Sequence, residues 1–146
     1  MARLKTIPDA RVFAAVRRLL AAGGEKAVAF ASVAKATGLA PPTLVQRYGS
    51  RDAMLRAALG AAWTELEAAT ERAEADAPTS TKGAQALLKA LGAESPEAAD
   101  LALLAADFRD ATLRDRAENW RHRVEAALAL RLGGGAKGRE AAAILF

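Results

Sequence analysis

The residues with the clearest chemical potential are the basic side chains in the first third of the chain. Residues 1–56 contain ten Lys or Arg and three Asp or Glu, which gives this span a net charge of +7. The remaining eleven basic and fourteen acidic side chains give residues 57–146 a net charge of −3, for a total of +4. Cationic side chains gathered in one part of a chain are typical of a surface that binds a polyanion. Charge alone leaves DNA, RNA and a membrane surface open.

A second candidate feature is the stretch "SVAKATGLAPPTLVQRYGS" at 32–50, where a glycine and two adjacent prolines separate two short apolar-patterned segments. Gly38 permits a sharp turn after a helix predicted at 30–37. Pro41 suits the N-cap and Pro42 the first position of a helix predicted at 42–48, where no backbone N–H is needed. This pattern predicts a helix-turn-helix, whose second helix enters the DNA major groove. The alternative is an ordinary helical hairpin inside a bundle.

The elements that position these residues are expected to be helices throughout. Aromatic residues make up only 5% of the chain and strong helix formers predominate, so the composition favours an all-α fold. Asp9 is expected to cap a first helix that ends near residue 23, and Ser50 to cap a long fourth helix that fades in the polar stretch 75–83. That fourth helix carries an apolar stripe formed by Leu55, Leu59, Ala62, Leu66, Ala69 and Ala73.

Further helices are predicted beyond residue 83. One covers 84–92, a second opens at Ser95-Pro96 and runs through Phe108, and a third covers about 113–132. "GGGAKG" at 133–138 is expected to break the pattern before a last apolar helix, "REAAAILF" at 139–146. Because this helix ends the chain without a cap, we expect the C-terminal bundle to be cut short.

Residues 12–60 resemble the N-terminal domain of TetR-family transcriptional regulators, over about a third of the chain. The resemblance is carried by an amphipathic first helix that ends in glycine, by Val33-Ala34, by Gly38-Leu39, and by Ser50, Arg51 and Asp52 at the start of the fourth helix. It implies a three-helix helix-turn-helix domain at 1–56, joined by a long fourth helix to a helical effector-binding and dimerisation domain at 57–146.

The resemblance also implies roles for individual residues. Thr43, Val45 and Gln46 would face the groove, where Gln46 can pair with adenine and Val45 can contact a thymine methyl group. Arg47 and Arg51 would reach phosphates. Four more residues complete the DNA-binding set. Pro42 stands where the family has a glycine whose backbone approaches DNA, and Tyr48 is equally compatible with the core. Arg3 and Lys5 belong to an N-terminal arm or to a solvated tail.

Further positions depart from the family pattern. Ala29 stands where the family has a threonine that opens the second helix and touches phosphate, so both the cap and the contact are lost. Val45 stands in place of the recognition-helix tyrosine, and Arg47 in place of its histidine.

The C-terminal half offers few chemical signals. An effector pocket between helices is one interpretation of Leu104, Phe108, Trp120 and Val124, and a simple core is the other. Asp107, Asp110 and Asp115 are spaced too irregularly for a metal site and fit a solvated helix face. There are no cysteines, and we find no Ser-His-Asp, phosphate-loop or paired-carboxylate signature. We therefore expect no catalytic activity, no metal and no cofactor.

Together these features predict a cytoplasmic, ligand-responsive repressor that binds a palindromic operator as a homodimer. The sequence contains no run of about 18 apolar residues, so no membrane span is predicted. The N-terminus lacks the pattern of a signal peptide. The partners expected are operator DNA, an unidentified small-molecule effector and a second copy of the chain, which we expect to associate through residues 139–146. The alternative is a helical protein-interaction module of the same fold that has lost specific DNA binding.

Overall fold

The computed structural model describes residues 7–93, 110–133 and 135–145. Within these ranges the secondary structure is helical and no strand occurs, which confirms the predicted all-α class. The chain divides into two compact units, Met1–Ala61 and Ala62–Phe146, and the long helix α4 (Arg51–Asp76) contributes to both. The predicted domain boundary at 56/57 falls within this helix.

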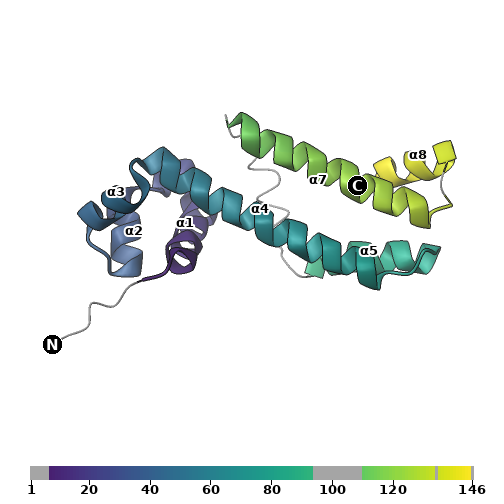
Figure 1. The fold of residues 1–146 in the computed structure, drawn as a ribbon, viewed down its shortest axis with the longest axis horizontal. Helices are drawn as coiled ribbons and strands as arrows, with labels where there is room; N and C mark the ends of the chain where they lie inside the picture. The colour runs from purple at the N-terminus through teal and green to yellow at the C-terminus, as the bar shows by residue number, and fades with distance from the viewer. Residues whose placement is uncertain (1–6, 94–109, 134, 146) are drawn as a thin grey trace. The chain divides into compact units, whose positions relative to one another are not determined.

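The first unit gathers three helices and the start of α4 (Figure 1). It consists of α1 (Asp9–Gly23), a short 3₁₀ turn η1 (Glu25–Ala27), α2 (Phe30–Thr37), α3 (Pro41–Tyr48) and the first turns of α4. The four helices, and Val28 just after η1, contribute apolar side chains that are almost completely buried: Val12, Val16, Val28, Val33, Leu44, Met54 and Leu55. Burial of one such side chain contributes roughly 1.5–3 kcal/mol.

The turn between α2 and α3 is short because Gly38 ends α2 in the left-handed conformation, with φ 80°. Its N–H donates to the carbonyl oxygen of Ala34 at 2.8 Å. Only Gly38, Leu39 and Ala40 separate the two helices. The bounds predicted for α2 are confirmed.

Two predicted N-caps are wrong by one residue. Pro8 caps α1 and Asp9 is its first helical residue, while Ala40 caps α3 and Pro41 and Pro42 both lie inside that helix. The first hydrogen bonds of α3 run from the N–H groups at positions 43 and 44 to the Ala40 carbonyl oxygen, at 3.0 and 3.4 Å. Both prolines therefore occupy positions where a helix needs no N–H donor, and α3 loses no bond.

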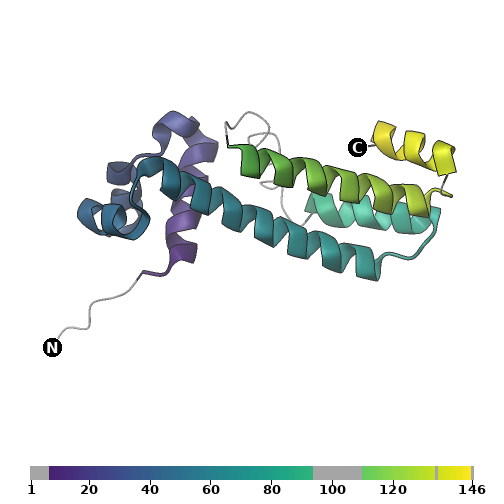
Figure 2. The same ribbon diagram turned by 45° about the horizontal axis from the view of Figure 1, so that its top comes forward.

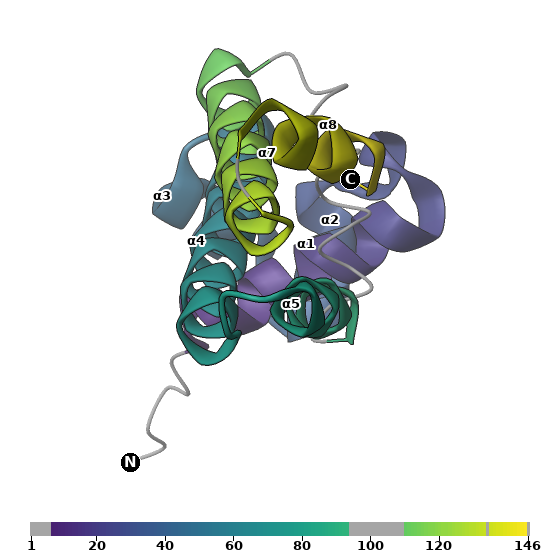
Figure 3. The same cartoon turned by 90° about the vertical axis from the view of Figure 1, so that its right-hand side faces the viewer.

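The second unit is built from the later turns of α4 with α5 (Thr81–Ala93), α7 (Ala111–Arg131) and α8 (Gly135–Leu145). In Figure 2, α7 runs alongside both α4 and α5, and Figure 3 shows α8 beside α7. One cluster of buried apolar side chains joins α5, α7 and α8: Ala84, Leu87, Val124, Leu128, Ala129 and Ala142.

Side-chain caps fix the starts of three helices. Ser50 Oγ accepts from the Ala53 N–H at 3.1 Å, as predicted, and Ser80 Oγ accepts from the Gly83 N–H at 3.2 Å. Asp110 Oδ1 accepts from the Leu113 N–H at 3.1 Å, so this aspartate begins α7.

Two further helices begin earlier than predicted. The first, α5, starts at Thr81 and not at residue 84. Gly83 allows this start because it has no side chain: a Cβ at this position would lie 1.6 Å from the Pro78 carbonyl oxygen. The second, α8, starts at Gly135, inside the predicted break. The helix predicted from Ser95 to Phe108 lies outside the described residues. No helix within the described ranges has both the length and the apolar character needed to cross a membrane.

Candidate nucleic-acid interface

The helix α3 has a buried face and an exposed face with different chemistry. Leu44 is completely buried, whereas Pro42, Val45 and Gln46 are exposed. These three residues stand three and four positions apart, so they lie on one side of the helix. Val45 keeps 44% of its surface accessible, so an aliphatic side chain faces solvent here. Thr43 is half-buried between the two faces.

The N-termini of α2 and α3 differ in the backbone donors that they offer. At α3, Pro41 and Pro42 have no N–H, and the Thr43 N–H is already bonded to Ala40. At α2 the N-cap is Ala29, and no side chain caps the helix. The first-turn N–H groups of α2 are therefore better suited than those of α3 to donate hydrogen bonds to an anion.

Arg47, at the C-terminal end of α3, is bound within the unit. Its Nη1 donates to the Ile7 carbonyl oxygen at 2.7 Å and lies 3.5 Å from Oδ1 of Asp9. The side chain keeps 25% of its surface exposed. The arginine that the resemblance assigns to phosphate thus fastens the segment before α1 to the end of α3.

Tyr48 contributes to the same junction. Its hydroxyl donates to Oδ1 of Asp9 at 2.5 Å, and its ring packs against Phe13 with centroids 6.0 Å apart. Burial and the hydrogen bond to Asp9 raise the pKa of Tyr48 to about 12. Tyr48 is half-buried.

Arg51 is also engaged inside the unit. Its Nε donates to the Val28 carbonyl oxygen at 2.6 Å, and its Nη2 donates to the Glu25 carbonyl oxygen. Its Nη1 lies 3.2 Å from the Glu25 carboxylate and 3.0 Å from that of Asp52. This guanidinium ties η1 and the entry to α2 onto the first turn of α4.

Other cations are better placed for a ligand in solvent. Arg11, Arg18, Lys26 and Lys35 are exposed, and Lys35 lies in the last turn of α2. Arg3 and Lys5 lie outside the described residues. Asp9 was predicted only as a helix cap and not as a site residue, because its partners Arg47 and Tyr48 are 38 and 39 positions away along the chain.

In the second unit, the two described members of the predicted effector set lie in the core or pack against it. Val124 is completely buried in the α5–α7–α8 cluster. Trp120 lies with its ring centroid 6.0 Å from that of Trp63, and its Nε1 donates to Thr70 Oγ1 at 2.8 Å. Leu104 and Phe108 lie outside the described residues.

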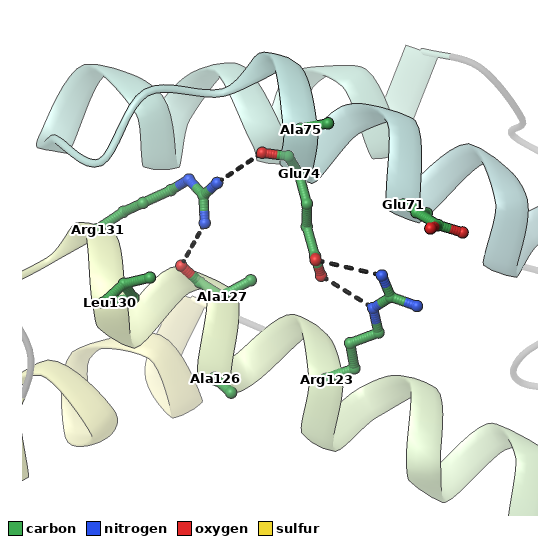
Figure 4. Close-up of a pocket in the computed structure, with 8 residues that line it drawn as sticks. All are labelled: Glu71, Glu74, Ala75, Arg123, Ala126, Ala127, Leu130 and Arg131. Carbon is green, nitrogen blue, oxygen red and sulfur yellow. Dashed lines mark hydrogen bonds and ion pairs between the residues drawn. The ribbon is translucent and has the colours of Figure 1, made fainter.

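An open groove of about 610 Å³ lies elsewhere, between α4 and α7 (Figure 4). It is lined by Glu71, Glu74, Ala75, Arg123, Ala126, Ala127, Leu130 and Arg131. Arg123 pairs with the Glu74 carboxylate at 3.1 and 3.3 Å. Arg131 donates to the carbonyl oxygens of Ala127, Glu74 and Ala77, so it satisfies carbonyls at the end of α4. Several polar groups of the groove thus have protein partners already.

Side chains of α7 contact α4 at successive turns, which makes the pair parallel. The contacts advance together along both helices: Arg116 with Glu67, Trp120 with Thr70, Arg123 with Glu74, and Arg131 with the carbonyls of Glu74 and Ala77. Asp110 and Asp115 join no cluster of three potential metal ligands within the described residues.

Comparison of the chain with protein-family models, with curated proteins and with solved structures finds no match.

Proposed function

We propose that this chain is a DNA-binding transcriptional regulator similar to the TetR family, in which α2 and α3 form a helix-turn-helix. In this proposal α3 is the recognition helix. Gln46 reads a base edge, Val45 contacts a thymine methyl group, and Thr43 and Pro42 lie at the end that approaches the groove.

The observation that carries the proposal is the exposed face of α3. Leu44 anchors the helix in the core, while Val45 and Gln46 remain accessible on a rigid element only eight residues long. A side chain that reads a base must be held in place and yet stay unburied, and this face meets both conditions.

The charge of the first unit supports the same partner. The net charge of +7 over residues 1–56 suits a phosphate backbone. Lys26 is exposed in η1, before the uncapped start of α2, and Lys35 is exposed in the last turn of α2. Because Arg47 and Arg51 are engaged internally, we assign phosphate contacts first to these lysines and to the first-turn N–H groups of α2.

We further propose that the regulator acts as a homodimer on a palindromic operator in the cytoplasm, without catalytic activity. A small-molecule effector held by the second unit would change the separation of the two recognition helices, which fixed half-site spacing does not tolerate.

Two large apolar side chains of the second unit support self-association. Leu130 is 61% exposed on α7 and Ile144 is 85% exposed on α8. Light scattering tests this point: Ile144→Asp is expected to shift the native dimer toward monomer, and the matched control Ala143→Asp, at a neighbouring exposed position, is expected to shift it less. A native chain that is monomeric at high concentration contradicts the dimer.

The second candidate is a helical protein-interaction module of the same fold. The internal engagement of Arg47 and Arg51 favours it, because two cations that would otherwise meet phosphate are already bonded. The exposed aliphatic surface of Val45 also suits a protein partner.

Selection of bound sequences from random duplex DNA at two salt concentrations separates the two candidates. The regulator predicts enrichment of a palindrome and an affinity that falls steeply with salt, because phosphate contacts release counterions. Weak binding without sequence enrichment at both salt concentrations contradicts the regulator and supports the interaction module.

A further inference from the structure

The groove between α4 and α7 offers an accessible apolar surface in the second unit. Its volume of about 610 Å³ lies in the range of small-molecule sites. Small side chains line much of it: Ala75, Ala126 and Ala127. Leu130, which also lines the groove, is 61% exposed. An apolar ligand surface can therefore pack here without displacing a core residue.

A row of glutamates on α4 runs along the same groove, and its middle member is unpaired. Glu67, Glu71 and Glu74 are spaced four and three residues apart, so they stand on one side of the helix. Arg116 pairs with Glu67 at 2.9 Å, and Arg123 pairs with Glu74 at 3.1 Å. Glu71 is exposed, and no hydrogen bond or ion pair engages it within the described part of the chain (Figure 4).

The charges around the groove favour a cation over an anion. The hydrogen bond to Glu74 and the charges of the neighbouring glutamates, Glu71 among them, raise the pKa of Arg123. Arg123 already donates to both carboxylate oxygens of Glu74. The guanidinium of Arg131 is buried and donates to carbonyl oxygens near the C-terminal end of α4, where the helix dipole is negative. The Glu71 carboxylate is thus the charged group that the groove leaves for a ligand.

The geometry points to a binding site for an elongated organic cation, with its ammonium group at Glu71 and its apolar chain along the alanine-lined surface toward Leu130. The charge of Glu71 acts on Arg123, and Arg123 and Leu130 are separated along α7 by about 10 Å, at 1.5 Å per residue. A ligand of that length reaches both ends of the groove. Its affinity would come from the apolar area that it buries and from a charge-assisted hydrogen bond to the carboxylate.

Isothermal titration calorimetry with three probes of the same chain length tests the preference for a cation. The probes are octylammonium, octanol and octanoate, each titrated into the native chain without DNA. Octylammonium is expected to bind saturably and at least about tenfold more tightly than octanoate, a difference equivalent to about 1.4 kcal/mol. Octanol is expected to bind with an affinity between the two.

Two variants of the groove separate the carboxylate from the apolar surface. Glu71→Gln keeps the shape and removes the charge, so it is expected to weaken octylammonium binding about tenfold and to change octanol binding less than about twofold. Ala75→Leu places a larger side chain in the groove at an exposed helical position, and is expected to weaken both probes. Glu140→Gln, at an exposed position of α8, is the matched control and is expected to bind octylammonium as the native chain does. Thermal unfolding of each variant confirms that folded proteins are compared.

Three results overturn the inference: equal affinity of the native chain and Glu71→Gln for octylammonium, octanoate binding at least as tight as that of octylammonium, or no saturable octylammonium binding to the native chain. The site does not depend on the proposed function, since its ligand is measured without DNA. A chain that binds octylammonium through Glu71 and does not bind DNA retains this site and overturns only the regulator.

Discussion

The hydroxyl of Tyr48 donates a hydrogen bond to the carboxylate of Asp9 at 2.5 Å, across 39 positions of the sequence. The contact brings the start of α1 against the end of α3 and so closes the first unit around its core. A single tyrosine occurs in the chain, which makes this junction accessible to spectroscopy without labels.

The ionisation of Tyr48 is predicted to be displaced to high pH. Burial and the bond to Asp9 raise its pKa from 10.0 to about 12 in the folded chain. The folded state therefore favours the protonated form, and the stability that this contributes is complete below pH 10 and is lost as the pH rises toward about 12. Tyrosinate absorbance during a pH titration measures the pKa directly.

Asp9→Asn is the control for that titration. The neutral amide removes the charge that opposes tyrosinate formation, so the pKa of Tyr48 is expected to move back toward its ordinary value. Ionisation of the native chain at the ordinary value, or an unchanged titration in Asp9→Asn, contradicts the assigned contact.

Arg51 is predicted to stabilise the first unit through the backbone carbonyls that it binds. Arg51→Ala leaves the carbonyl oxygens of Val28 and Glu25 without this donor, and is expected to lower the free energy of unfolding by about 1–3 kcal/mol. Arg51→Lys is expected to recover only part of the loss, because one ammonium group cannot span the same acceptors. Denaturant unfolding measures the change, with Lys35→Ala on the exposed surface as control. Equal stability of Arg51→Ala and the control counts against this stabilising role of Arg51.

Features of this unit could be predicted from the sequence where their physical cause lies in neighbouring residues, and not where it lies in distant ones. Gly38 predicts the end of α2 because only a residue without a Cβ readily adopts a φ of 80°. The bond from Arg51 to the Val28 carbonyl oxygen and the contacts that join Ile7 and Asp9 to the end of α3 were not predictable. Their partners lie 23 to 40 positions apart and meet only when the core forms.

The same distinction holds in the second unit. The part of the α4 stripe in this unit correctly predicts buried Ala62 and Leu66, yet periodicity gives no sign that Thr70 is completely buried. Thr70 is buried because Trp120, 50 positions away, supplies a partner for its hydroxyl. In the candidate interface, the sequence predicts the exposed face of α3, whereas the internal bonds of Arg47 and Arg51 required the structure.

Thr70 is predicted to be a key buried polar group of the second unit. Its Oγ1 accepts from Trp120 Nε1 at 2.8 Å and donates to the Leu66 carbonyl oxygen at 2.7 Å. Thr70→Val preserves shape but leaves the indole N–H without this acceptor, so the free energy of unfolding is expected to fall by about 1–3 kcal/mol. Thr112→Val, at an exposed position of α7, is the control. Chemical denaturation followed by tryptophan fluorescence checks this, and a stability loss no larger than that of the control is inconsistent with the contact.

The central claim is that the exposed face of α3 reads DNA bases, and Gln46 tests it most directly. The measurement is the affinity of the native chain and of Gln46→Ala for the selected operator and for each of its single base-pair variants. The account predicts that Gln46→Ala loses about 1–3 kcal/mol of discrimination at one base pair in each half-site and leaves preferences elsewhere unchanged. A uniform change at every position, or none at any position, would contradict the account.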